Sequence, residues 1–232
     1  MRKYIVETIA NPKSAVSEAY RTLRTNIQFT NVDNVMKKIL FTSAGPGEGK
    51  TSTVANLGAS IAQSGKSVLI IDGDLRNPSQ HKIFNVPNHN GLSSTLVEDV
   101  SSLAHVISTE IEGLDLLLAG PIPPNPAELL GSKRMKQLLH DVEDAYDIIL
   151  IDSPPTIAVT DSSILAQIVD GVILILASGE VKQDYALRAK EQLEKVGAKI
   201  IGTVLNKVQI KTKEHYYYYY YHGNQNVGTH SM

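Results

Sequence analysis

Short apolar runs that alternate with helical segments constrain the fold of this chain more than any other feature. Five such runs lie at residues 39–41, 68–71, 148–151, 172–176 and 200–205. Continuous runs rich in β-branched residues are typical of strands that are covered on both faces, as in a parallel sheet. Segments with a helical period lie between them, at residues 52–64, 132–144 and 182–196. The alternation predicts an α/β fold: a doubly wound, mostly parallel sheet with helices on both faces.

One domain accounts for most of the chain. No linker or shift in composition interrupts its body, and residues 14–29 have the amphipathic pattern of a helix that Ser14 or Ser17 caps. Toward the C-terminus the sequence becomes polar and then runs HYYYYYYHGNQNVGTHSM, without periodicity or an apolar face. We therefore expect a folded domain over residues 1–210 and a flexible, tyrosine-rich tail over residues 211–232.

Composition excludes several classes of protein. The 24 acidic and 22 basic side chains give a net charge of −2, which argues against a nucleic-acid binder, because such proteins need a basic surface. The chain has no cysteine, so disulfides, thiolate catalysis and cysteine-ligated metals are excluded. The apolar runs fall far short of the roughly 20 residues that span a bilayer, and the N-terminus lacks the apolar segment of a secretory signal. We expect a cytoplasmic protein.

A glycine-rich loop predicts a nucleotide site. The segment AGPGEGKT follows the first apolar run and opens a helical segment. In that context the loop is a P-loop: its backbone N–H groups face phosphate oxygens, and the helix N-terminus adds the positive end of its dipole. We expect Lys50 to reach the β- and γ-phosphates and the Thr51 hydroxyl to ligate Mg²⁺; Ala44 replaces the first glycine of the usual pattern. The predicted nucleotide-binding residues of the loop are Gly45, Pro46, Gly47, Glu48, Gly49, Lys50, Thr51 and Ser52.

Two further apolar runs end in aspartates. The second run leads into Asp72, Asp74 and Arg76, and the third ends at Asp152. The carboxyl ends of parallel strands form the ligand-binding edge of such a sheet, so these carboxylates are expected to hold magnesium and to polarise an incoming hydroxyl. A single aspartate after a strand is usually a turn or helix cap. Two such positions beside a P-loop predict a metal site.

The segments AGPGEGKT, LIIDGDLR and IILIDSPP together resemble the Walker A, Walker A′ and Walker B motifs of the bacterial tyrosine kinases (BY-kinases), which control capsule and exopolysaccharide export. The resemblance continues through AGPIPPNPAELL at residues 119–130, EAYRTLRTN at residues 18–26 and the terminal tyrosines, so it covers nearly the whole chain. It implies a protein-tyrosine kinase with a P-loop NTPase fold like that of the Min and Par ATPases. ATP and Mg²⁺ are the implied cofactors, and residues 1–210 are then the kinase domain.

The resemblance also implies roles for single residues. Asp72 is the expected general base toward a tyrosine hydroxyl. Arg76 and Asn206 join the nucleotide-binding residues, although a strand-end cap explains Asn206 equally well. The implied catalytic residues are Lys50, Asp72, Asp74 and Asp152, and the implied metal ligands are Thr51, Asp72 and Asp152.

Both ends of the chain resemble parts that this family uses in assembly and regulation. The tyrosines Tyr216, Tyr217, Tyr218, Tyr219, Tyr220 and Tyr221 are expected autophosphorylation sites. Glu18, Arg21 and Arg24 match the motif that builds a homo-oligomeric ring from the helix at residues 14–29, although an ion pair between Glu18 and Arg21 within one helix also fits their spacing. The implied partners are protein substrates, a cognate tyrosine phosphatase and a separate membrane protein. The cytoplasmic tail of that membrane protein activates the kinase and recruits it to the inner face of the membrane.

A Min/Par-type ATPase switch that transfers phosphate only to water is the alternative. Those proteins resemble KGGxGKT at the loop, with a lysine where this chain has Gly45. Many of them end in a basic amphipathic membrane helix, which the tyrosine-rich terminus does not provide. Both differences favour the kinase. A third interpretation, an adaptor that binds ATP only for structure, conflicts with the intact set of acidic residues.

Overall fold

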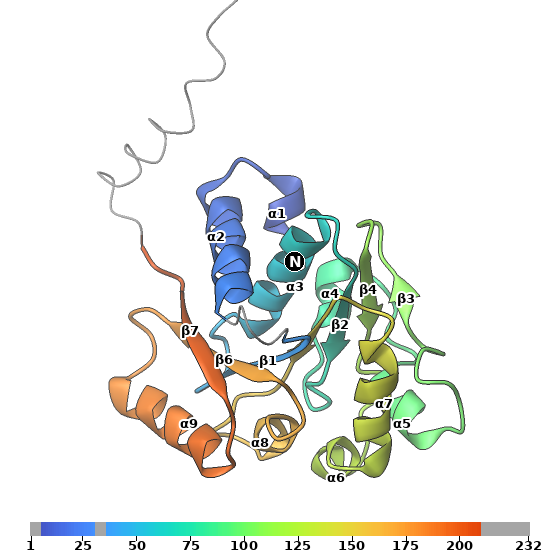
Figure 1. Cartoon of the computed structure of the whole chain (residues 1–232). Helices are drawn as coiled ribbons and strands as arrows, with labels where there is room; N and C mark the ends of the chain where they lie inside the picture. Colours follow the sequence, from blue (N-terminus) through green and yellow to red (C-terminus); the bar gives the residue numbers. More distant parts are fainter. Residues whose placement is uncertain (1–5, 31–35, 210–232) are drawn as a thin grey trace, which may run out of the picture.

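The computed structural model describes residues 6–30 and 36–209, which contain a seven-stranded sheet (Figure 1). Its order is β3-β4-β2-β5-β1-β6-β7, and every neighbouring pair is parallel except β3 and β4. The strands are β1 (Lys38–Ser43), β2 (Val68–Asp72), β3 (Ile107–Ser108), β4 (Leu114–Leu117), β5 (Ile148–Asp152), β6 (Gly171–Ala177) and β7 (Ile200–Asn206). The predicted doubly wound, mostly parallel α/β fold is confirmed.

All five predicted runs form strands, whereas β3 and β4 were missed. The missed strand β4 has four residues, and Asp115 interrupts its apolar pattern. Its partner β3 has two residues and runs antiparallel to it at the edge of the sheet. Segments this short carry no periodicity, so the pairing of β4 with β2 and of β3 with β4, and not local sequence, decides that they are strands.

Helices cover both faces of the sheet (Figure 1). One face carries α1 (Glu7–Ala10), α2 (Ala15–Phe29), α3 (Lys50–Ala62) and α4 (Gln80–Phe84). The other carries α5 (Leu92–Val97), α6 (Pro126–Leu130), α7 (Lys133–Glu143), α8 (Asp161–Leu165) and α9 (Gln183–Lys195). Two apolar layers result, one on each side of the central strands.

Serine side chains cap the N-termini of α2 and α7. Ser14 precedes α2 and its side chain accepts a hydrogen bond from the backbone N–H of Ser17 at 3.1 Å, which decides between the two predicted caps. Ser132 caps α7 in the same way, through the N–H of Met135. The helix predicted at residues 52–64 begins two residues earlier, at Lys50, because the P-loop leads directly into it.

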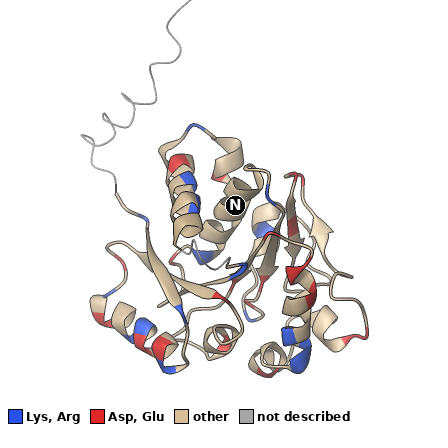
Figure 2. Cartoon of the chain, viewed as in Figure 1, with Lys and Arg blue, Asp and Glu red and all other residues tan. Residues whose placement is uncertain are grey.

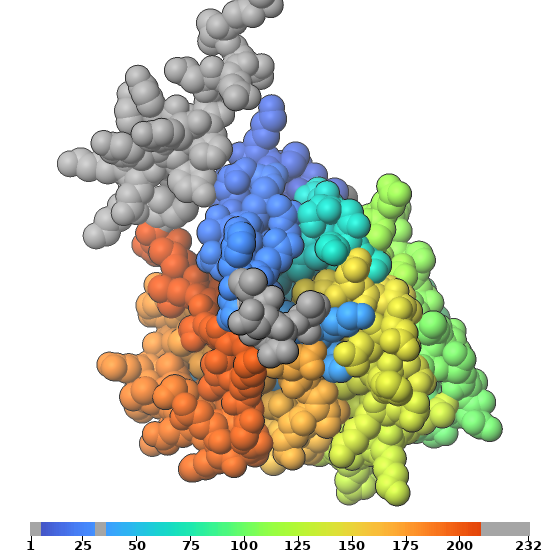
Figure 3. Space-filling model, in the orientation of Figure 1, coloured from blue at the N-terminus to red at the C-terminus, as the bar shows by residue number. Residues whose placement is uncertain are grey.

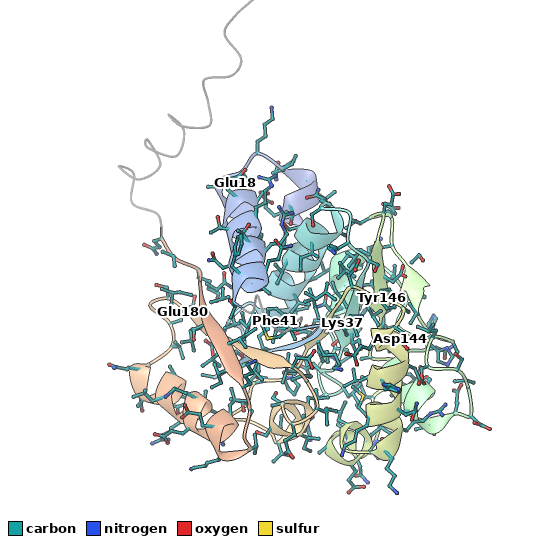
Figure 4. All side chains as sticks on the ribbon, in the orientation of Figure 1. Glu18, Lys37, Phe41, Asp144, Tyr146 and Glu180 are labelled. Atoms are coloured by element: carbon teal, nitrogen blue, oxygen red, sulfur yellow. The ribbon has the colours of Figure 1, made fainter. Side chains whose placement is uncertain are left out.

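The central strands are buried on both faces. On β1, Ile39 and Phe41 pack toward α2 and α3, while Leu40 packs toward the opposite helices. Figure 4 labels Phe41 in the middle of the molecule and Glu18 near the N-terminal end of α2. Complete burial of each such side chain contributes about 1.5–3 kcal/mol to the stability of the fold.

Charged side chains of both signs are distributed over the outer helices, as α7 and α9 show in Figure 2. None of the helices in residues 6–30 and 36–209 has the length and hydropathy that crossing a membrane requires. The predicted tail at residues 211–232, with its tyrosine cluster, lies outside the described residues.

Candidate active site

The P-loop connects the end of β1 to α3 and depends on glycine at two positions. Gly47 and Gly49 have φ angles of 75° and 90°, the left-handed region that side chains disfavour. A Cβ atom at Gly49 would lie 2.0 Å from the Nδ2 atom of Asn206, so the loop also needs the space. Lys50 and Thr51 then occupy the first turn of α3, where free backbone N–H groups and the helix dipole favour phosphate.

Glu48 fastens the P-loop to the sheet. Its carboxylate is buried and accepts hydrogen bonds from the backbone N–H of Gly45 and, at 2.9 Å, from that of Ala177 at the end of β6. Its backbone oxygen accepts a hydrogen bond from the Nδ2 atom of Asn206 at 2.9 Å. Glu48 and Asn206 were both predicted to bind nucleotide. Their contacts in the described residues hold the loop in place from behind.

The register of β2 and β5 places two carboxylates side by side, because Asp72 pairs directly with Asp152. Asp72 is fully buried and accepts the backbone N–H groups of Asp74, Ser79 and Gln80 at 3.3, 3.1 and 3.0 Å. Burial, together with the neighbouring charge of Asp152, raises the pKa of Asp72 well above its ordinary value. These hydrogen bonds from the backbone also hold the segment after β2 folded back over the site.

Asp152 lies at the centre of the site. Burial raises the pKa of Asp152 to about 6, opposed by the charge of Lys50, by the polar side chain of Thr51 and by the hydrogen bond from Gln80. Its Oδ2 atom accepts a hydrogen bond from the Nε2 atom of Gln80 at 3.0 Å. Its Oδ1 atom is buried and has no hydrogen-bond partner among the described residues. A buried carboxylate oxygen without a donor is a place where a cation or its water fits.

Asp74 and Arg76 lie on the open side of the site. The Oδ1 atom of Asp74 accepts backbone N–H groups from Arg76 and Asn77 at 3.3 and 2.9 Å, which closes a turn. Arg76 was predicted to bind nucleotide. Its guanidinium makes a bidentate pair with the fully buried Asp161, at 2.8 and 2.9 Å, and so joins this turn to the N-terminus of α8.

These segments surround a cleft of about 490 Å³. Pro46, Lys50 and Thr51 line it from the P-loop, and Asp74 and Arg76 line it from the segment after β2. The segment after β5 completes the wall with Pro154, Pro155, Ala158 and Val159. The structure therefore brings the three predicted motifs to one cleft, with the buried pair Asp72 and Asp152 behind it.

The donor set fits magnesium bound together with a nucleotide. The described residues contain no cluster of three or more acidic, histidine or cysteine side chains that could hold a metal alone. Mg²⁺ characteristically takes only one or two carboxylates and completes its octahedron with water and phosphate oxygens. The Thr51 hydroxyl and the unpartnered oxygen of Asp152 match that pattern, whereas Asp74 is engaged in its turn.

The sequence analysis missed two residues that hold site side chains in place by hydrogen bonds, Gln80 and Asp161. Each is fully buried and binds a predicted site residue far from it in the sequence, Asp152 and Arg76 respectively. Neither belongs to the three motifs. Their location just after the segments with Asp72 and Asp152 was the only available signal.

The three residues of the expected ring motif are held by their own chain. Glu18 forms an ion pair with Arg21 within α2, and Arg21 also donates to the backbone oxygen of Pro12. Arg24 donates to the backbone oxygen of Ser60 on α3 at 2.5 Å. The pairing within one helix is therefore present, and α2 lies at the surface of the molecule (Figure 3).

Comparisons with known proteins agree with these motifs. A family model described as an AAA domain matches residues 36–210. The chain is 45% identical over 211 residues to the tyrosine-protein kinase YwqD of Bacillus subtilis (strain 168), which covers 91% of this chain and 89% of that protein. It is 41% identical over 205 residues to the putative tyrosine-protein kinase CapB of Staphylococcus aureus, with 88% and 90% covered.

Solved structures lead to the same group. The chimerical protein CapA2B2 superposes with a TM-score of 0.84 at 41% identity, over 88% of this chain and 90% of that one. The kinase domain of the Escherichia coli tyrosine kinase ETK has a TM-score of 0.83 at 33% identity, over 89% and 82%. The septum site-determining protein MinD of Pyrococcus horikoshii OT3 shares the fold, with a TM-score of 0.64 at 22% identity over 78% and 76%. The chain belongs to the AAA-domain family and, within it, to the bacterial tyrosine-protein kinases.

Proposed function

We propose that this chain is an ATP- and Mg²⁺-dependent protein-tyrosine kinase that autophosphorylates its C-terminal tyrosines and regulates capsular or extracellular polysaccharide synthesis and export. The observation that carries the proposal is the pairing of Asp72 with Asp152 beside Lys50 and Thr51. It occurs in a chain that matches tyrosine kinases along about nine-tenths of its length. The names of those relatives, both tyrosine-protein kinases, support the activity.

The residues of the cleft account for phosphoryl transfer by positioning and charge. The P-loop amides and Lys50 hold the phosphates and stabilise the charge that spreads over the transferred group. Magnesium, when bound, neutralises charge on the phosphate oxygens, and Thr51 and Asp152 are its proposed ligands. Asp72 was the third predicted ligand, but both of its oxygens accept backbone N–H groups. Glu48 contributes indirectly, because its two backbone bonds keep the loop curled before nucleotide arrives.

A tyrosine hydroxyl, with an ordinary pKa near 10, needs a proton acceptor at neutral pH. Asp72 is the base that the resemblance implies, but it lies behind the cleft and accepts three backbone N–H groups. Asp74 lines the cleft itself. A tyrosine that enters the cleft therefore meets Asp74 first, and it reaches Asp72 only when residues 73–79 move. Comparing Asp72→Asn with Asp74→Asn in a kinase assay distinguishes the two.

Assembly and location belong to the same proposal. We place a homo-oligomeric ring contact on the surface of α2, where Glu18 and Arg21 are partly exposed. A separate membrane protein with a cytoplasmic tail would recruit and activate the otherwise cytoplasmic kinase, and a tyrosine phosphatase would reverse its action. Light scattering tests the ring: Arg21→Ala with Arg24→Ala should give monomers, while an unchanged mass would contradict the assignment.

Intact-mass spectrometry after incubation with Mg-ATP tests the activity. The wild-type chain should gain phosphate, in steps of one phosphoryl group, on Tyr216–Tyr221. Lys50→Met should gain none alone but should be labelled when mixed with an active chain that lacks the tail. A chain in which these six tyrosines are replaced by phenylalanine is the control for site.

The same experiment separates the kinase from the Min/Par-type switch. A switch releases inorganic phosphate at a measurable rate and leaves the mass of the chain unchanged. A kinase adds mass to the chain. Release of phosphate without any added mass would therefore refute the proposed function.

A further inference from the structure

Gln80 donates a hydrogen bond to each carboxylate of the acidic pair, Asp72 and Asp152. It is the first residue of α4 and is fully buried. Its backbone N–H donates to Asp72 Oδ2 at 3.0 Å. Its side-chain Nε2 donates to Asp152 Oδ2 at 3.0 Å and to the backbone oxygen of Thr51 at 3.3 Å. A single residue thus connects the end of β2, the end of β5 and the first turn of α3.

Two buried acceptor atoms of this group have no partner among the described residues: Asp152 Oδ1 and Gln80 Oε1. The orientation of the amide follows from chemistry. Two acceptors, the oxygen of Thr51 and Oδ2 of Asp152, require the NH₂ group, so the Oε1 atom faces elsewhere. Buried polar atoms are nearly always satisfied, and a hydrated divalent cation supplies both a positive charge and donor waters.

We infer that Gln80 is a positioning residue for the magnesium ion of the proposed nucleotide site, so the inference rests on the proposed function. Its Nε2 atom holds one oxygen of Asp152 and leaves the other free for the ion or its water. Its Oε1 atom, which is buried and has no partner among the described residues, would accept a hydrogen bond from a water bound to that ion. Gln80 therefore touches neither the nucleotide nor the reacting atoms and acts through Asp152. Residues that orient metal-binding carboxylates in this way typically change metal affinity 10- to 100-fold when replaced.

Calorimetric titration of ADP, in excess EDTA and over a series of Mg²⁺ concentrations, tests the inference without catalysis. Gln80→Met keeps the length and volume of the side chain but removes both polar atoms. We expect ADP affinity in EDTA to stay within about twofold of wild type, because the P-loop is intact. The Mg²⁺ concentration that gives half of the metal-dependent gain in affinity should rise about tenfold or more.

Two controls separate positioning from general damage. Gln63→Met changes the same residue type at the exposed C-terminal end of α3 and should leave both titrations unchanged. Thr8→Val removes the hydrogen bonds that the buried hydroxyl of Thr8, on α1, makes with Asn56 on α3. It should lower thermal stability without shifting the magnesium response. Should Gln80→Met fail to fold, Gln80→Asn replaces it, because the shorter amide does not reach Asp152.

The inference is overturned if Gln80→Met loses affinity equally in EDTA and in Mg²⁺, or if its magnesium response equals that of wild type. It is also overturned if wild-type ADP affinity does not depend on Mg²⁺. Failure of the proposed kinase reaction is a separate result, because it shows as ATP hydrolysis without tyrosine phosphorylation and does not enter the ADP titration.

Discussion

Removing the side chain of Arg76 should destabilise the fold, because it strands a buried charge. Asp161 is fully buried, and both of its oxygens depend on the Arg76 guanidinium. Breaking a buried ion pair by removing one partner costs about 3–5 kcal/mol. Here the Arg76 side chain is 42% exposed, so water can take its place beside Asp161 in the alanine variant and reduce this cost. We expect Arg76→Ala to lower the free energy of unfolding by about 2–3 kcal/mol.

Urea unfolding followed by circular dichroism, without nucleotide, measures this cost. Arg76→Lys should retain part of the stability, since an ammonium group cannot make both bonds of the planar fork. Arg76→Met with Asp161→Leu should recover most of it, because no charge is then left buried. Arg188→Ala is the control: this exposed arginine lies over the ring of Tyr185 at 5.9 Å, and its loss should change stability by less than about 0.5 kcal/mol. An equally small change for Arg76→Ala would refute the reasoning.

Three further measurements probe the site. Because burial raises the pKa of Asp152 to about 6, the folded chain retains a proton that the unfolded chain releases near pH 4, so ionisation of Asp152 above pH 6 destabilises the fold without ligand. Asp152→Asn should therefore raise the melting temperature at pH 8, with a gain that shrinks as the pH falls from 6 to 4; a gain independent of pH would contradict this. Asn206→Ala removes the bond to the P-loop backbone and should weaken ADP binding about fivefold by calorimetry, or about 1 kcal/mol, whereas unaltered affinity would show that the bond is dispensable. Glu48→Gln places an NH₂ group against a backbone N–H of Gly45 or Ala177 and should lower the free energy of unfolding in urea by about 1–3 kcal/mol. Wild-type stability of this variant would show that the two hydrogen bonds of Glu48 do not stabilise the P-loop.

Local sequence was sufficient wherever a feature depends on residues that are close in the chain. Continuous apolar runs predicted five of the strands, and Ser14 was one of two predicted caps for α2. The P-loop is local as well, because its curl depends on Gly47 and Gly49 and its helix begins at the next residue. Strands β3 and β4 were not predictable in this way, since the pairing of their few residues defines them.

Tertiary structure decided how the predicted residues act on one another. The sequence placed Asp72 and Asp152 each at the end of a strand, but only the register of β2 against β5 sets the two carboxylates opposite each other, and only their burial in the fold raises the pKa of each. The partners Gln80 and Asp161 lie 72 and 85 residues away from the side chains that they bind. Such contacts depend on strand pairing and on the path of the connecting segments. A sequence pattern encodes local conformation and burial, so it identifies which side chains reach the edge of the sheet and leaves their partners to the fold.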